Sequence, residues 1–180
     1  MSRYVALLRG INVGPKKRIR MDDLRALIEG LGYSDVKTYV NSGNVVFSAD
    51  GPQDNLALAN GIEGALAAHH ELDVPVVVRS GDELVRIVAN NPFPEHAAHH
   101  KTLHVSFLSE EPAADLVDSL ARVERGEDDY RVLGKDVYLH YPNGMTGAVF
   151  MVNGLDKALK VTSTSRNWRT VVTLAKMTVE

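Results

Sequence analysis

Hydrophobic residues along the first half of the chain switch between the spacing of strands and that of helices. The predicted elements are strand 3–8, helix 21–31, strand 36–40, strand 44–48, helix 53–70 and strand 74–79. The two middle strands flank "NSG", a short glycine-containing turn that is typical of a β-hairpin. The order β-α-β-β-α-β predicts a ferredoxin-like subdomain over residues 1–80.

The second half begins with "SGDE" at residues 80–83, a capping box that predicts the start of a linker helix at 81–90. The elements predicted after it are strand 102–108, a helix opened by Pro112, a hairpin around Gly134 and a last helix from about Ser165. This order is β-α-β-β-α, which is the same unit without its final strand. We therefore expect an α+β fold, with two ferredoxin-like βαββαβ-type subdomains packed in one chain over residues 1–80 and 81–180.

Composition favours a soluble globular protein. The 180 residues are 44% hydrophobic, enough to bury a core, yet no apolar run is long enough to cross a bilayer. The start "MSRYVALLRG" does not match a signal peptide, because its apolar stretch is too short. The absence of cysteine excludes disulfides, thiolate metal sites and cysteine nucleophiles. These features predict a cytoplasmic protein without a membrane segment.

Charge is unevenly distributed along the chain. The net charge of -3 is a poor match for a dedicated nucleic-acid-binding protein. Residues 1–20 carry six basic and no acidic side chains, and residues 157–179 carry five basic and no acidic ones. Residues 109–129 carry eight acidic side chains against two arginines. If the two basic ends meet in space, they form one positive patch on an acidic protein.

The loop "RGINVGPKKRIR" (9–20) follows the first strand and contains five basic residues and no acidic one. A glycine-bearing loop between a strand and a helix can turn backbone N–H groups and basic side chains toward an anion. Its glycine spacing fits neither the P-loop nor the dinucleotide-binding pattern. Tyr4, Tyr39 and Phe47 are too few for an aromatic RNA-binding platform. The alternative is a loop that its charges merely keep solvated.

Two further segments carry polar groups suited to a ligand. Asn41, Ser42 and Asn44 can either build the hairpin turn or bind a polar molecule. "TSTSRNWRT" (162–170) places hydroxyl groups and Arg166 at the predicted helix start, where the dipole favours an anion. An ordinary N-cap at Thr164 or Ser165 explains the same pattern.

Together these segments define a predicted ligand-binding site. Its residues are Arg9, Gly10, Asn12, Gly14, Lys16, Arg18, Asn41, Ser42, Asn44, Ser165, Arg166 and Asn167. No metal site is predicted, although His96, His100 and His104 are four residues apart, because prolines interrupt a helix there and no acidic partner has the usual spacing. No nucleophile elbow is present.

The motifs "LLRGINVG", "NSGNVVF", "LHVSFL" and "SRNWRTV" resemble the bacterial family catalogued as domain of unknown function 1697. The resemblance extends nearly from end to end and implies two ferredoxin-like subdomains, but no established activity. Members usually carry a glycine near the position of Pro15. They also tend to have a "GRSKL"-like stretch after "YPNG", where this chain has "MTGAVF" (145–150) and lacks the expected arginine and lysine.

Three functions follow from these patterns. The leading hypothesis is binding of a phosphate-bearing or other small anionic ligand. The first alternative is an enzyme acting on a phosphorylated or nucleotide substrate, with Asp22 and Asp23 as the nearest carboxylates. The second is an RNA-binding or protein-interaction module without catalysis, for which nucleic acid is not favoured. The sequence leaves the ligand, any cofactor and the oligomeric state open.

Overall fold

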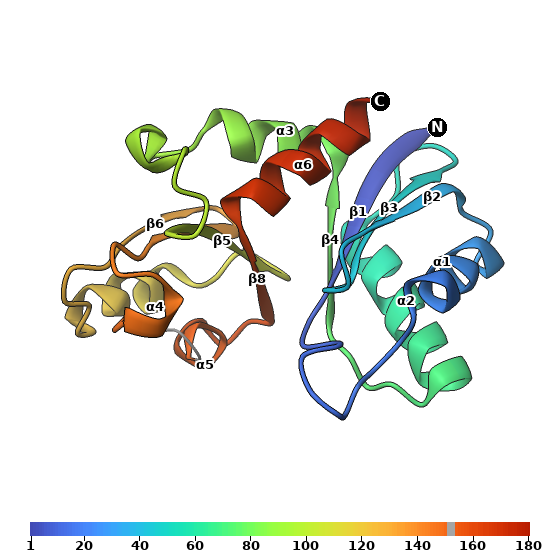
Figure 1. Cartoon of the computed structure of the whole chain (residues 1–180), viewed down its shortest axis with the longest axis horizontal. Helices are drawn as coiled ribbons and strands as arrows, with labels where there is room; N and C mark the ends of the chain where they lie inside the picture. The colour runs from blue at the N-terminus through green and yellow to red at the C-terminus, as the bar shows by residue number, and fades with distance from the viewer. Residues whose placement is uncertain (151–153) are drawn as a thin grey trace. The chain divides into compact units, whose positions relative to one another are not determined.

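A computed structural model describes residues 1–150 and 154–180 and has an α+β fold with two four-stranded antiparallel sheets (Figure 1). The first half contains β1 (Ser2–Leu8), α1 (Met21–Gly30), β2 (Ser34–Tyr39), β3 (Asn44–Ala49), α2 (Asn55–His70), β4 (Val76–Ser80) and α3 (Gly81–Ala89). The second contains β5 (Leu103–Leu108), α4 (Ala114–Ser119), β6 (Asp129–Leu133), β7 (Asp136–His140), α5 (Leu155–Leu159), β8 (Ser163–Asn167) and α6 (Trp168–Val179). Short 3-10 turns lie at Pro94–His96, Leu120–Arg122 and Met145–Gly147.

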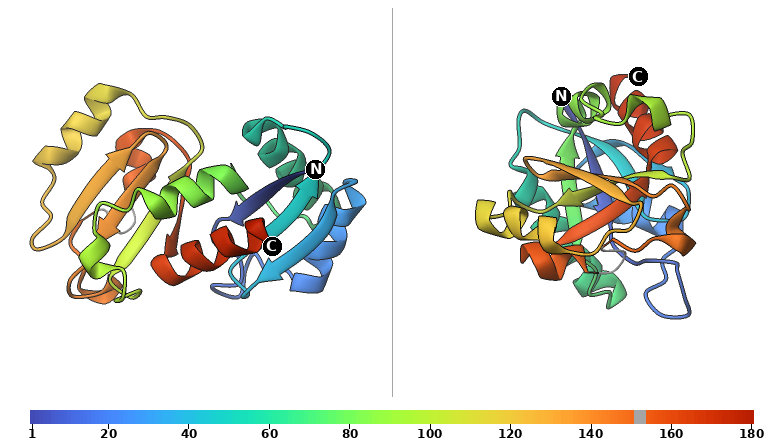
Figure 2. Two further views of the ribbon diagram at one scale, coloured as in Figure 1. Left: turned by 90° about the horizontal axis from the view of Figure 1, so that it is seen from above. Right: turned by 90° about the vertical axis from the view of Figure 1, so that its left-hand side faces the viewer.

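The first sheet has the strand order β2-β3-β1-β4, and α1 and α2 lie on the same face of it (Figures 1 and 2). Alternate residues of β1 point to that face, where Tyr4, Ala6 and Leu8 join the buried core. The residues that α1 and α2 add to this core include Leu24, Leu27, Ile28, Leu58, Ile62 and Leu66. Both helices and the hairpin lie where the hydrophobic pattern predicts them.

The second sheet has the strand order β6-β7-β5-β8. Its core contains apolar residues of β5 and β7 together with side chains of α4 and α5, among them Leu108, Leu139, Leu155 and Leu159. Asp128 is 4% exposed and its carboxylate accepts from the backbone N–H groups of Val149 and Phe150, at 2.6 and 2.8 Å. This contact anchors the segment after β7.

The end of the chain differs from the prediction. A helix was expected from about Ser165, but residues Ser163–Asn167 form β8, and α6 begins at Trp168. A short helix that was not predicted, α5, comes before β8. The second half therefore has the complete βαββαβ order, and β8 occupies the place beside β5 that was expected to be empty. The hydroxyl-rich sequence of β8 was interpreted as the start of a helix, because Ser and Thr are also the usual residues of helix caps.

The chain divides into two compact units. The first comprises residues 1–86 and 173–180, and the second comprises residues 87–172. The division falls within α3 and α6, and the domain boundary placed after residue 80 stays a prediction. In the described part of the chain, no helix is both long and apolar enough to span a membrane.

Candidate functional site

The loop between β1 and α1 is organised by the side chain of Asn12. Its Nδ2 donates to the carbonyl groups of Ile19 and Asn41, both at 2.9 Å, and its Oδ1 accepts from the N–H of Ile19 at 3.0 Å. The backbone N–H of Asn12 donates to the carbonyl of Lys17 at 3.0 Å. These bonds close the loop on itself and fasten it to the β2–β3 turn. The structure thus brings together two predicted site residues, Asn12 and Asn41.

The base of the loop is held by contacts with neighbouring segments. Lys17 Nζ donates to the carbonyl of Asp73 at 2.8 Å, and the N–H of Leu8 donates to the carbonyl of Gly43 at 2.9 Å. Gly43 has φ +80°, and a Cβ there would lie 2.7 Å from the Cβ of Leu8. Only glycine fits this close approach of the turn to β1. The loop therefore starts from a fixed frame, which suits a binding site.

Asn44 has a structural role in the turn. It is fully buried, and its Nδ2 donates to the carbonyl of Tyr39 and to Ser42 Oγ, both at 2.9 Å. Its amide group therefore helps to build the hairpin. Of the predicted turn residues, Asn41 and Ser42 are the exposed ones.

A cleft of about 540 Å³ lies beside this frame, within the first unit. Residues from four segments line it: Asn12, Arg18 and Arg20 of the loop, Asp23 of α1, Asn41 of the turn and His70 of α2. Arg20 is the N-cap of α1; its side chain makes no capping hydrogen bond, and its Nη2 lies 4.0 Å from Asp22 Oδ2 in the first turn. The cleft thus combines two guanidinium groups with the positive end of a helix dipole.

The cleft includes ionisable residues outside the predicted set. Arg20, Asp23 and His70 line it, whereas only Asn12, Arg18 and Asn41 of the predicted residues do so. A second hollow of about 410 Å³ between α1 and α2 shares Asp23 and His70 with the cleft. Arg20 could have been included in the predicted site from the sequence, because it is the last residue of the basic loop. His70 could not be placed from sequence, since it depends on how the end of α2 packs.

The other predicted residues of the loop are not among those that line the cleft. Gly10, Gly14 and Lys16 are exposed and Arg9 is half-buried. Gly10 has φ +68°, with open space where a Cβ would point. These residues are accessible to solvent, and their role in binding stays a prediction.

Ser165, Arg166 and Asn167 belong to the second unit, on β8. Arg166 is 8% exposed, and its Nη1 donates to Thr164 Oγ1 at 2.8 Å and to the carbonyl of Ser165 at 2.9 Å. Burial lowers the pKa of Arg166 to about 10, so the group remains cationic at neutral pH. Asn167 Oδ1 accepts from the N–H of Thr170 at 3.0 Å and caps α6. A composite site that joins these residues to the loop stays a prediction.

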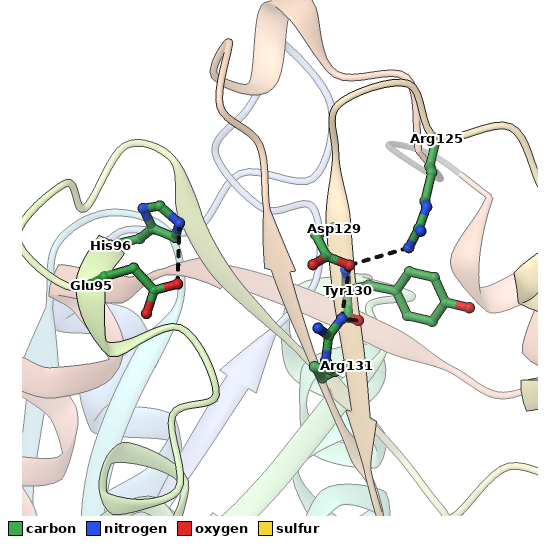
Figure 3. A network of polar contacts seen from close by, with 6 residues as sticks. All are labelled: Glu95, His96, Arg125, Asp129, Tyr130 and Arg131. Carbon is green, nitrogen blue, oxygen red and sulfur yellow. Dashed lines mark hydrogen bonds and ion pairs between the residues drawn. The ribbon is translucent and has the colours of Figure 1, made fainter.

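A polar network in the second unit contains His96, one of the three histidines considered as metal ligands (Figure 3). His96 Nε2 lies 3.4 Å from a carboxylate oxygen of Glu95, and Asp129 Oδ1 accepts from Arg125 and Arg131, at 3.2 and 2.8 Å. The ring of His96 stacks on that of His140, with centroids 3.7 Å apart. Burial, followed by the neighbouring His96, lowers the pKa of His140.

The histidines spaced four residues apart in sequence, His96, His100 and His104, are not aligned for a metal centre. His96 lies in a 3-10 turn and His104 on β5, so the four-residue spacing does not align them on one helix. Among the described residues, no group of three or more His, Asp or Glu side chains could hold a metal ion.

Comparison with known proteins identifies the family. The model of the family described as "Protein of unknown function (DUF1697)" matches residues 1–138. The chain belongs to this family. Among solved structures, this DUF1697 member is similar to the conserved bacterial protein SP0830 from Streptococcus pneumoniae, with 22% identity, a TM-score of 0.75 and 98% of each chain covered. At this identity the likeness shows a shared fold. No curated protein matches the chain.

Proposed function

We propose that this protein binds a small phosphate-bearing or other anionic ligand in the cleft of the first unit. The observation that carries the proposal is the convergence of Arg18, Arg20 and the N-terminus of α1 on one hollow. Guanidinium groups bind phosphate and carboxylate through paired charge-assisted hydrogen bonds, and a helix N-terminus adds a favourable dipole. The cytoplasm, where we place the protein, is rich in such ligands.

The polar residues of the cleft would orient the ligand. Asn12 is fixed by its own hydrogen bonds, so the loop that carries Arg18 is ordered before any ligand arrives. A preordered site loses less conformational entropy on binding. The negative charge of Asp23 repels an anion at one side of the cleft. It therefore favours a ligand whose negative charge lies near Arg18 and Arg20. The predicted contribution of Ser165, Arg166 and Asn167 is part of this proposal.

Calorimetric titration with inorganic pyrophosphate and with ATP tests the proposal. We expect saturable binding that Arg18→Ala weakens by about tenfold or more, because a hydrogen bond to a charged partner is worth roughly 1.5–3 kcal/mol. Arg122→Ala is the matched control, since it removes an exposed arginine of the second unit and should leave the affinity unchanged. Absence of binding by the wild-type protein, or equal loss in both variants, would overturn the proposal.

An enzyme acting on a phosphorylated or nucleotide substrate is the second candidate, because a carboxylate and an imidazole, those of Asp23 and His70, line the same cleft. Phosphoryl transfer commonly needs a divalent cation bridging carboxylate and phosphate. Binding that requires Mg²⁺ and is lost in Asp23→Asn would favour this candidate. Binding that is independent of Mg²⁺ would favour the simple binding protein, whereas a steep fall in RNA affinity with salt would point to the nucleic-acid alternative.

A further inference from the structure

The two units repeat each other strand by strand. Tyr4 on β1 pairs with Ser80 on β4, and His104 on β5 pairs with Asn167 on β8. The backbone contacts at the strand ends correspond too. The N–H of Leu8 bonds to the carbonyl of Gly43 in the first unit, and the N–H of Leu108 bonds to the carbonyl of Lys135 in the second, both at 2.9 Å. His104 therefore occupies the position of Tyr4, and Ser106 the position of Ala6.

The equivalent faces of the two sheets differ in polarity. In the first unit the helix-covered face of β1 and β4 is apolar and belongs to the core; its residues are Tyr4, Ala6, Leu8, Val76 and Val78. In the second unit Leu108, at the position of Leu8, also joins the core, but other positions of the equivalent face carry polar side chains. We call His104, Ser106, Ser165 and Asn167 the β5–β8 strip, because directly paired residues on antiparallel strands point to the same face.

The helix that covers this face is much shorter in the second unit. In the first unit α2 has 16 residues and packs on β4. Its counterpart α5 has 5 residues. Val78 is buried in the first unit, whereas the corresponding Ser165 is exposed. The β8 side of this face is thus exposed at Ser165, whereas His104 and Ser106 on β5 are buried.

Two buried polar atoms of the strip have no hydrogen-bond partner among the described residues. They are His104 Nδ1 and Ser106 Oγ, and their residues are only 9% and 1% exposed. An unpaired buried polar atom is unfavourable, and most such atoms in native proteins are satisfied by protein, water or a ligand. The corresponding residues of the first unit carry no such defect, since Tyr4 Oη accepts from the N–H of Gln53 at 2.6 Å and Ala6 has no polar side-chain atom.

We propose that the β5–β8 strip is the floor of a second binding site, for a small uncharged ligand that carries adjacent hydroxyl groups. The serine hydroxyl and the neutral imidazole can each donate or accept, as a ligand hydroxyl can. Ser165 Oγ and Asn167 Nδ2 provide further polar groups at the exposed side. The site shares no residue with the cleft of the first unit, so either can fail without the other; it assigns Ser165 and Asn167 to an uncharged ligand instead of the composite anion site.

The chemistry of the strip selects against a charged ligand. Its four side chains include no carboxylate, lysine or arginine, and Arg166 points to the opposite face of β8 because neighbouring strand residues alternate. Burial lowers the pKa of His104 to about 4, so its imidazole is neutral at pH 7. An anion placed on this partly buried surface would have no compensating charge.

NMR of the full chain with ¹³C-labelled histidine tests the site, with D-ribose and adenosine as uncharged probes. We expect a saturable shift of the His104 imidazole signals, which His104→Gln would assign, while the exposed His69 and His99 stay unmoved. Ser106→Ala and Ser165→Ala should each weaken the response several-fold, in keeping with the loss of one neutral hydrogen bond.

Ser34→Ala is the matched control, because Ser34 lies on β2, an edge strand of the first sheet, as Ser165 lies on β8, an edge strand of the second. It should leave the His104 response unchanged. The proposal is overturned if neither uncharged probe moves the His104 signals at millimolar concentration, which would leave buried water as the partner of these atoms. It is equally overturned if inorganic phosphate moves them more strongly than ribose or adenosine.

Discussion

His104 lies on β5 with 9% of its surface exposed, and its ring is 5.7 Å from that of Tyr141. Burial lowers its pKa from 6.5 to about 4, because the cationic form loses its hydration. The unfolded chain therefore takes up a proton near pH 6.5, and the folded chain only near pH 4. Between these values the unfolded state binds more protons, so the free energy of unfolding falls as the pH falls.

We predict that His104 reduces stability by roughly 3 kcal/mol between pH 7 and pH 4, since each unit of pKa difference corresponds to about 1.4 kcal/mol. Urea unfolding of wild-type protein and His104→Gln across this range measures the effect. The stability of the variant should depend less on pH than that of the wild type. His99→Gln, a change at an exposed histidine, should follow the wild type, and parallel curves for wild type and His104→Gln would refute the prediction.

Individual residues also show how far sequence reasoning extends. The residue types around the loop indicated an anion, and Arg18, Asn12 and Asn41 do line one cleft. The sequence does not distinguish a side chain that binds a ligand from one that builds the frame. Asn12 and Asn44 use their amides to fasten backbone, a role that depends on atoms brought close only by folding.

At the scale of elements, the capping box predicted from "SGDE" is present at the start of α3. Ser80 Oγ accepts from the N–H of Glu83 at 3.2 Å, and Glu83 Oε2 accepts from the N–H of Ser80 at 2.7 Å. The same carboxylate oxygen accepts from Asn55 Nδ2 at 2.7 Å, which ties α2 to the start of α3. The Glu83 side chain thus caps α3 and also binds the first residue of α2.

We predict that Glu83→Ala lowers the free energy of unfolding by roughly 1–3 kcal/mol, because it removes the cap and leaves two donors without their acceptor. Asp82→Ala is the control, since it also removes one negative charge from the first turn of α3 but at an exposed position. Chemical denaturation of both variants measures the difference. Equal losses in the two would mean that charge at the helix end, rather than the hydrogen bonds, provides the stability.

The strand β8 was not predicted from the sequence, because a polar strand lacks the hydrophobic pattern by which strands are predicted. A strand that pairs on one side only and has one polar face carries few apolar residues, so "STSRN" lacks the alternation that revealed the other strands. A comparison of the two halves of the chain could have indicated β8. Arg79 followed by Ser80 ends β4 before α3, and Arg166 followed by Asn167 ends β8 before α6.

At the scale of the whole molecule, the hydrophobic pattern predicted the α+β class and the two ferredoxin-like units, because strand and helix spacings depend on local geometry. It does not indicate which polar side chains line the cleft of the first unit, because these come from the loop, α1, the β2–β3 turn and α2, which only folding brings together. The likeness to SP0830 extends over both units, so the paired architecture is shared by proteins of low sequence identity.

The central claim is that an anion binds at the cleft of the first unit, and backbone NMR of ¹⁵N-labelled protein titrated with inorganic pyrophosphate tests it most directly. We predict saturable shifts of the amide signals of Asn12, Asn41 and residues 18–23, the segment that carries both arginines into the N-terminus of α1. Shifts at residues 165–167 in the same titration would extend the site to the composite form and would count against an uncharged ligand on the β5–β8 strip. If the amides of the cleft stay unmoved at millimolar pyrophosphate, or only signals elsewhere change, the anion-binding account is contradicted.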